Sequence, residues 1–140
     1  DASVLACQDN NYAYYWLREE AGYNRSVLFR YDKEERNLIK LTEFSTTAVL
    51  SASSPQLPGF EKMFKIPGKN ELLLTCPNGL CFALNWETKG LRNLSFEPGQ
   101  GSQASSVQVY RDKMYGLVYR SDLFVEEADY HTNVVVRSLD

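Results

Sequence analysis

The stretch SVLFRYD, residues 26–32, decides the fold class. Its β-branched and aromatic residues are typical of a strand, and Asp32 at its end is a common turn residue. The charged segment KEER, residues 33–36, continues the turn, and NLIKL, residues 37–41, begins another short strand. The sequence therefore predicts an antiparallel hairpin with a short, charged turn.

This order of strand, charged turn and strand recurs along the chain. LCFALNW, residues 80–86, precedes a charged turn and GLRNL, residues 90–94, and Phe29 and Phe82 lie about 53 residues apart. VVVRSLD, residues 134–140, is a third copy at about twice that distance from the first. Further strand candidates precede each copy, so each unit predicts a four-stranded antiparallel sheet of about 50 residues, with the last unit lacking its fourth strand.

Short apolar segments separated by turn residues predict strands along most of the chain. Besides the repeated stretches, they are residues 12–18, 63–66, 72–75, 107–110 and 114–120. Residues 17–21 suffice for one helical turn, but their apolar positions do not keep a period of 3.6 residues. The fold class we expect is all-β.

A four-stranded repeat of this length is the signature of a propeller blade. FRYD at 29–32 followed by LIKL at 38–41 resembles kelch-like blades, in which a strand ending in Asp precedes a turn and a short final strand. The diglycine that such blades carry after their second strand is missing, so the resemblance is to β-propellers in general. Since propellers have four to eight blades, three units imply an incomplete or open β-propeller-like fold. A β-sandwich of repeat-related sheets, half of a dimeric ring, and a fragment are the alternatives.

Length and charge limit the classes of protein to which the chain belongs. Its 140 residues fit one all-β domain, with repeat units at about 1–45, 58–97 and 105–140. The 15 Lys and Arg and 18 Asp and Glu residues are interspersed, so a nucleic-acid partner is not expected. No apolar run approaches the roughly 20 residues of a membrane helix.

Two cysteines flank a strong hairpin signal. Cys76 and Cys81 enclose Pro77-Asn78-Gly79-Leu80, and Asn-Gly favours a two-residue turn. In that register the cysteines lie opposite each other, so we expect a cross-strand disulfide. A pair of reduced, buried thiols is the alternative, and Cys7 is left over in either case.

The disulfide indicates an oxidising compartment, so we expect a periplasmic or secreted protein. The chain begins with Asp1 instead of Met, which agrees with a mature protein or with a fragment. Asn24 and Asn93 begin tripeptides that match the glycosylation pattern, but this pattern often occurs by chance.

Candidates for catalysis or metal binding are few. His131 is the only histidine and lies beside acidic residues, so we interpret it as a solvated side chain instead of a general base. Two acidic groups in equivalent connections form a possible acidic rim: Glu19-Glu20 and Glu126-Glu127-Asp129. We expect neither an enzyme nor a metal or cofactor, with a carbohydrate-binding or glycoside-processing domain at this rim as the alternative.

Two long connections between units, 45–59 and 96–106, predict a recognition surface or simple linkers. The second contains the candidate partner-binding residues Glu97, Gln100, Gly101, Ser102 and Gln103. Phe60, Phe96 and Tyr110 flank these connections as possible aromatic anchors.

The function we expect is protein binding outside the cytoplasm. An inhibitor or immunity protein that blocks a secreted hydrolase through an inter-unit loop fits the size of the chain, by analogy alone. A homodimer and a piece of a larger propeller scaffold remain alternatives.

Overall fold

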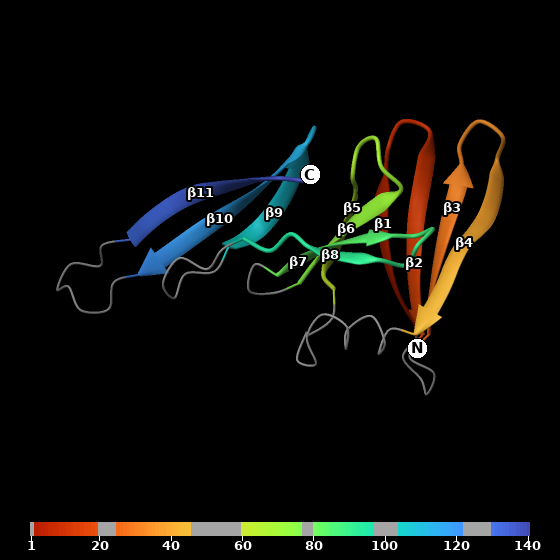
Figure 1. The fold of residues 1–140 in the computed structure, drawn as a ribbon, viewed down its shortest axis with the longest axis horizontal. Coiled ribbons are helices and arrows are strands. Elements are labelled where there is room, and N and C mark those ends of the chain that lie inside the picture. Colours follow the sequence, from red (N-terminus) through yellow and green to blue (C-terminus); the bar gives the residue numbers. More distant parts are fainter. Residues whose placement is uncertain (1, 20–24, 46–59, 77–79, 97–103, 122–129) are drawn as a thin grey trace.

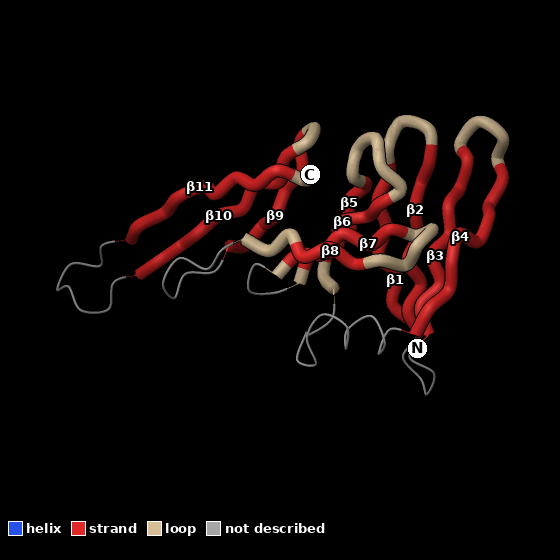
Figure 2. The backbone as a smooth tube through the Cα atoms, viewed as in Figure 1, coloured by secondary structure: helices blue, strands red, loops and turns tan. Residues whose placement is uncertain are grey.

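The computed structural model describes residues 2–19, 25–45, 60–76, 80–96, 104–121 and 130–140. All regular secondary structure in these ranges is β-strand, as Figure 2 shows. The strands are β1 (Ala2–Gln8), β2 (Tyr12–Glu19), β3 (Arg25–Asp32), β4 (Asn37–Ser45), β5 (Lys62–Lys65), β6 (Glu71–Thr75), β7 (Cys81–Asn85), β8 (Leu91–Asn93), β9 (Ala104–Tyr110), β10 (Lys113–Ser121) and β11 (Tyr130–Ser138). In this part of the chain no helix is long and apolar enough to cross a bilayer.

The strands form three antiparallel sheets, each made of consecutive strands. Their orders are β1-β2-β3-β4, β5-β6-β7-β8 and β11-β10-β9. We call them the first, middle and last sheets; Figure 1 shows the middle sheet between the other two. The fold is thus all-β and β-propeller-like, with repeated antiparallel sheets, as the sequence predicts.

Turn chemistry explains why the repeat is visible in the sequence. The Asp32 carboxylate at the end of β3 accepts hydrogen bonds from the backbone N–H groups two and three residues later, both at 3.0 Å. Asn85, at the end of β7, accepts the equivalent bonds at 2.9 and 3.1 Å. Arg36 and Lys89 then adopt positive φ values of 54° and 62° at matching places in the two turns. The repeated polar residue therefore fixes the hairpin after the third strand of each four-stranded sheet.

The middle sheet is buried on both faces. Leu72 and Leu74 pack against the first sheet, whereas Leu73 between them packs against the last sheet, and all three are fully buried. The first interface is built from the buried residues Tyr14, Trp16, Leu28, Met63, Leu72, Leu74, Leu84 and Trp86. The second is built from Ile66, Leu73, Cys81, Ala83, Leu94, Phe96, Val107, Met114 and Leu139. Side chains of alternate strand residues therefore join three sheets into two continuous cores.

The predicted disulfide between Cys76 and Cys81 is not present, because the hairpin register differs by one residue. Thr75, not Cys76, pairs with Cys81, and the Cys76 N–H donates to the Leu80 carbonyl at 2.7 Å. Cys76 packs with Phe82 on one face of the sheet, while Cys81 enters the core on the other face. All three cysteines are free thiols. A one-residue shift moves a side chain to the opposite face, so the symmetric spacing in the sequence was misleading.

Candidate binding cleft

A cleft of about 330 Å³, which we call the axial cleft, lies where the first strands of all three sheets end. β1 contacts β5, and the residues that follow β1, β5 and β9 meet at this point. The lining residues are Cys7, Gln8, Asp9, Phe64, Lys65, Pro67, Gly68, Val109 and Arg111. Its volume is in the range of small-ligand pockets, and its lining combines apolar and charged side chains.

Asp9 holds the first wall of the cleft. Its Oδ1 accepts hydrogen bonds from the N–H groups of Asn11 at 3.0 Å and Tyr12 at 2.8 Å, which closes the turn after β1. The Tyr14 hydroxyl donates to the other carboxylate oxygen at 3.5 Å. Burial, reinforced by the charge of Asp9, raises the pKa of Tyr14 to about 12. The Asp9 carboxylate is therefore used to build the turn.

Lys65, at the end of β5, holds the second wall. Its ammonium group donates to the carbonyls of Ile66 at 2.6 Å and Lys69, and lies 5.7 Å from the Trp86 ring centroid. Burial lowers the pKa of Lys65, although the neighbouring Asp9 partly offsets this effect. Its hydrogen bonds hold the loop after β5, where Gly68 takes a φ of 73°.

Cys7 lies between these walls as a protonated thiol. Burial raises the pKa of Cys7 to about 12, and the charge of Asp9 adds to this effect. A thiol with so high a pKa carries almost no thiolate at neutral pH, so it is a poor nucleophile. In this cleft Cys7 acts as a small apolar side chain.

Val109 and Arg111 form the third side of the cleft, and Tyr110 lies between them in the chain. Arg111 follows β9 in a tight turn, with a φ of 56°, and its guanidinium carbon lies 5.1 Å from the Tyr110 ring centroid. Tyr110 is 61% exposed, and Arg111 is also exposed. This aromatic and cationic pair, the Tyr110–Arg111 rim, thus faces solvent beside the cleft.

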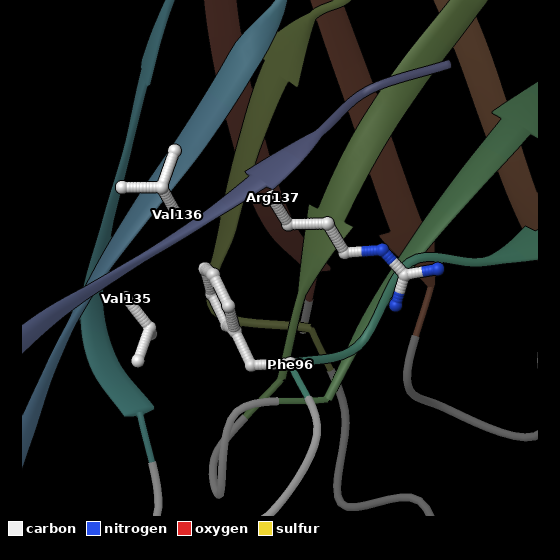
Figure 3. Close-up of a pocket in the computed structure, with 4 residues that line it drawn as sticks. All are labelled: Phe96, Val135, Val136 and Arg137. Atoms are coloured by element: carbon white, nitrogen blue, oxygen red, sulfur yellow. The ribbon is translucent and has the colours of Figure 1, made fainter.

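A second pocket of about 410 Å³ lies beside β11 and is lined by Phe96, Val135, Val136 and Arg137 (Figure 3). The Arg137 side chain extends away from Phe96 and donates hydrogen bonds to the carbonyls of Ser95 and Asn93. Phe96 is only 9% exposed and belongs to the core between the middle and last sheets. It therefore anchors the fold, which corrects the prediction that it anchors a partner.

Several predicted site residues lie outside the described residues: Glu97, Gln100, Gly101, Ser102, Gln103, Glu20, Glu126, Glu127 and Asp129. Glu19 ends β2, and His131 lies in β11. Of the other predicted aromatic anchors, Tyr110 is exposed. Phe60 is half-buried and packs edge-on against Trp16, with 5.6 Å between the two ring centroids. Within the described ranges, no three His, Cys, Asp or Glu side chains are grouped as metal ligands.

The sequence alone does not show that the cleft residues lie together. A signal for the cleft is nevertheless present in the sequence. A turn follows each of the strands β1, β5 and β9, at Asp9, Pro67 and Arg111. Aligning the ends of the first strands of the three units places these turns around one axis, as the propeller arrangement requires.

No protein-family model matches the chain, and no curated protein does so either. Two solved structures are similar in fold. A Clostridium novyi NT protein described as a conserved lipoprotein matches with a TM-score of 0.52 and 14% identity, over 99% of this chain and 88% of that one. The β-propeller domain of the Trilobed protease from Pyrococcus furiosus matches with a TM-score of 0.49 and 13% identity, over 99% of this chain and 43% of that one. At these identities the first match supports the fold alone.

Proposed function

We propose that this chain is an extracytoplasmic binding module that recognises another protein at the axial cleft and its Tyr110–Arg111 rim, without catalysing a reaction. The observation that carries this proposal is the exposed, stacked Tyr110 and Arg111 beside a cleft built from all three sheets. Tyrosine and arginine are enriched in the centres of protein interfaces, where they contribute most of the binding energy.

The charges in the cleft support an acidic partner group. Asp9 and Lys65 are engaged in hydrogen bonds that shape the two walls, whereas the Arg111 guanidinium is exposed at the rim. A guanidinium can bind a carboxylate with two parallel hydrogen bonds, and Phe64 and Val109 add apolar surface beside it. The preferred partner is therefore a protein loop that carries Asp or Glu next to an apolar side chain.

We infer the location outside the cytoplasm by analogy with the Clostridium lipoprotein, whose fold this chain shares. In such a compartment, secreted hydrolases are a suitable partner class, and an inhibitor or immunity protein would insert a loop or receive one at the cleft. This part of the proposal rests on analogy of fold and size.

A displayed library of random peptides tests the proposal directly. Peptides selected on the wild-type protein should be enriched in Asp and Glu, and should bind Arg111→Ala and Tyr110→Ala at least tenfold more weakly. Arg36→Ala is the matched control, because Arg36 is also exposed in a hairpin turn and has a φ of 54°. Selected peptides that bind both Arg111→Ala and Tyr110→Ala as well as the wild type would exclude the rim as the recognition site.

A further inference from the structure

Each outer sheet has one apolar face open to solvent. On the first sheet, Val4 and Leu38 are each 56% exposed and Tyr15 is 39% exposed. On the last sheet, Val136 is 52% exposed, and Val134 and Leu117 are 56% and 37% exposed. We call these surfaces the first outer face and the last outer face.

The strand register makes each outer face continuous. On the first sheet, Ala6 lies opposite Tyr15, which lies opposite Phe29, and Val4 lies opposite Leu17 in the next row. On the last sheet, Tyr115 lies opposite Val136, and Leu117 lies opposite Val134. Directly opposed residues of neighbouring strands point to the same face, so these side chains form contiguous apolar rows.

Faces of this composition are buried elsewhere in the same molecule. The middle sheet packs one face on the first sheet and the other on the last sheet, through leucines that are 0% exposed. Contiguous apolar surfaces left open on a folded protein are commonly interaction sites. The two outer faces are therefore candidates for a third sheet-on-sheet contact.

The two outer faces are complementary in direction. Around the axis, the inner face of the first sheet packs on the middle sheet, whose opposite face packs on the last sheet. If another sheet followed the last sheet with the same packing, the face that it placed against the last outer face would be equivalent to the first outer face. These faces lie at opposite ends of the molecule in Figure 1, so one chain does not bring its own two faces together.

Charge does not oppose this contact. On the first outer face the charged side chains of Lys40 and Glu43 form an ion pair with each other at 3.1 Å. On the last outer face the neutral Gln108 lies opposite Tyr115, and the one charged side chain of these described rows, Lys113, lies at their end, opposite Tyr110 and Ser138. Packing one face on the other therefore brings no like charges together at the centre.

We propose that two copies of this chain close a six-sheet ring, in which the last outer face of each copy packs on the first outer face of the other. Six sheets lie within the four to eight of known propellers, and the arrangement has the two-fold symmetry that is commonest among protein oligomers. The ring also completes the axial cleft, because the second copy adds the ends of its own β1, β5 and β9. Tyr110 lies at the edge of the last outer face, opposite Lys113, so in the ring the Tyr110–Arg111 rim borders the contact between the two copies; the inference itself does not depend on the proposed function.

Light scattering during size-exclusion chromatography tests the ring. At about 100 μM, well above the dissociation constants of specific dimers, the protein should have a mass of about 32 kDa, twice the 16.0 kDa of one chain. Val4→Lys and Val136→Lys should each weaken self-association at least tenfold. Both residues are exposed, so the variants should keep the wild-type circular dichroism spectrum, and Glu87→Lys, in the exposed turn between β7 and β8 of the middle sheet, is the control.

Mixing the two variants distinguishes this ring from other dimers. The Val136→Lys copy retains an intact first outer face and the Val4→Lys copy an intact last outer face, so their mixture should regain one contact and form a 1:1 species. A 16.0 kDa mass for the wild type, growth beyond the dimer, or a dimer insensitive to either variant would each overturn the proposal.

Discussion

Arg92 joins the middle sheet to the end of β11, and its removal should destabilise the fold strongly. Its Nε and Nη2 donate to the two carboxylate oxygens of Glu71 at 2.8 and 2.9 Å, and Nη2 also donates to the Leu139 carbonyl at 2.8 Å. The Glu71 side chain is 8% exposed, so Arg92→Ala leaves a buried carboxylate without its cation. We expect the free energy of unfolding to fall by about 3 kcal/mol, the low end for a broken buried pair, because the Arg92 side chain is 37% exposed and water screens part of the interaction.

Companion variants separate the ion pair from simple packing. Arg92→Lys keeps the charge but loses the two-pronged geometry, so its loss should be about 1–2 kcal/mol. The double variant Glu71→Leu, Arg92→Met removes both charges and should lie within about 1 kcal/mol of the wild type. The control is Lys40→Ala, which breaks an exposed ion pair and should cost less than about 0.5 kcal/mol.

Urea unfolding followed by tryptophan fluorescence measures these differences, since Trp16 and Trp86 are both buried in the core. A loss below about 1 kcal/mol for Arg92→Ala, or a double variant as unstable as Arg92→Ala, would refute this role of the ion pair.

Three further predictions concern the core, alkaline stability and a connection. Leu73→Ala should lower the free energy of unfolding by about 2–5 kcal/mol, because Leu73 is fully buried; urea unfolding with a loss below about 1 kcal/mol would contradict the packing of the last sheet on the middle sheet. Burial raises the pKa of the Cys76 and Cys81 thiols from 9.0 to about 12, so the unfolded chain loses these protons first. Stability should therefore fall above pH 9, by about 1.4 kcal/mol per thiol at pH 10, and Cys81→Ala should remove its share of that slope in urea titrations. We further propose that residues 100–103 add to the contact made at the Tyr110–Arg111 rim: replacing them by a Gly-Ser linker should leave the melting temperature nearly unchanged but weaken partner binding by more than about 0.5 kcal/mol in calorimetry, whereas unchanged affinity would make the segment only a linker and leave recognition to the rim.

The strands were largely predictable because local chemistry determines them. The stretch at residues 26–32 became β3, and its repeat at residues 80–86 contains β7, since β-branched and aromatic residues form the strands and Asp32 and Asn85 cap the following turns. β1 was missed, because Ala2–Gln8 mixes small, apolar and polar residues, and its adjacent apolar residues Val4 and Leu5 break the alternation typical of a strand.

The pairing register of the strands and the residues that form the cleft were harder to predict, because both depend on contacts between distant parts of the chain. A single residue of register decides whether Cys76 faces Cys81, and the pairing of Thr75 with Cys81 differs by one residue from the pairing that Asn78-Gly79 favours. Likewise, nothing local to Asp9, Lys65 or Arg111 shows that they share a cleft, because sheet packing brings them together.

The most direct test of the account is a methyl NOESY spectrum of the β6 leucines, because the account places successive side chains of this strand in two different cores. Leu73 should show contacts with the Met114 methyl group and none with Trp16, whereas Leu72 and Leu74 should show contacts on the first-sheet side, where Trp16 and Leu28 lie. Contacts of Leu73 and Leu74 with the same neighbouring sheet would contradict the face-to-face stacking of the three sheets, and with it the convergence of their first strands at the cleft.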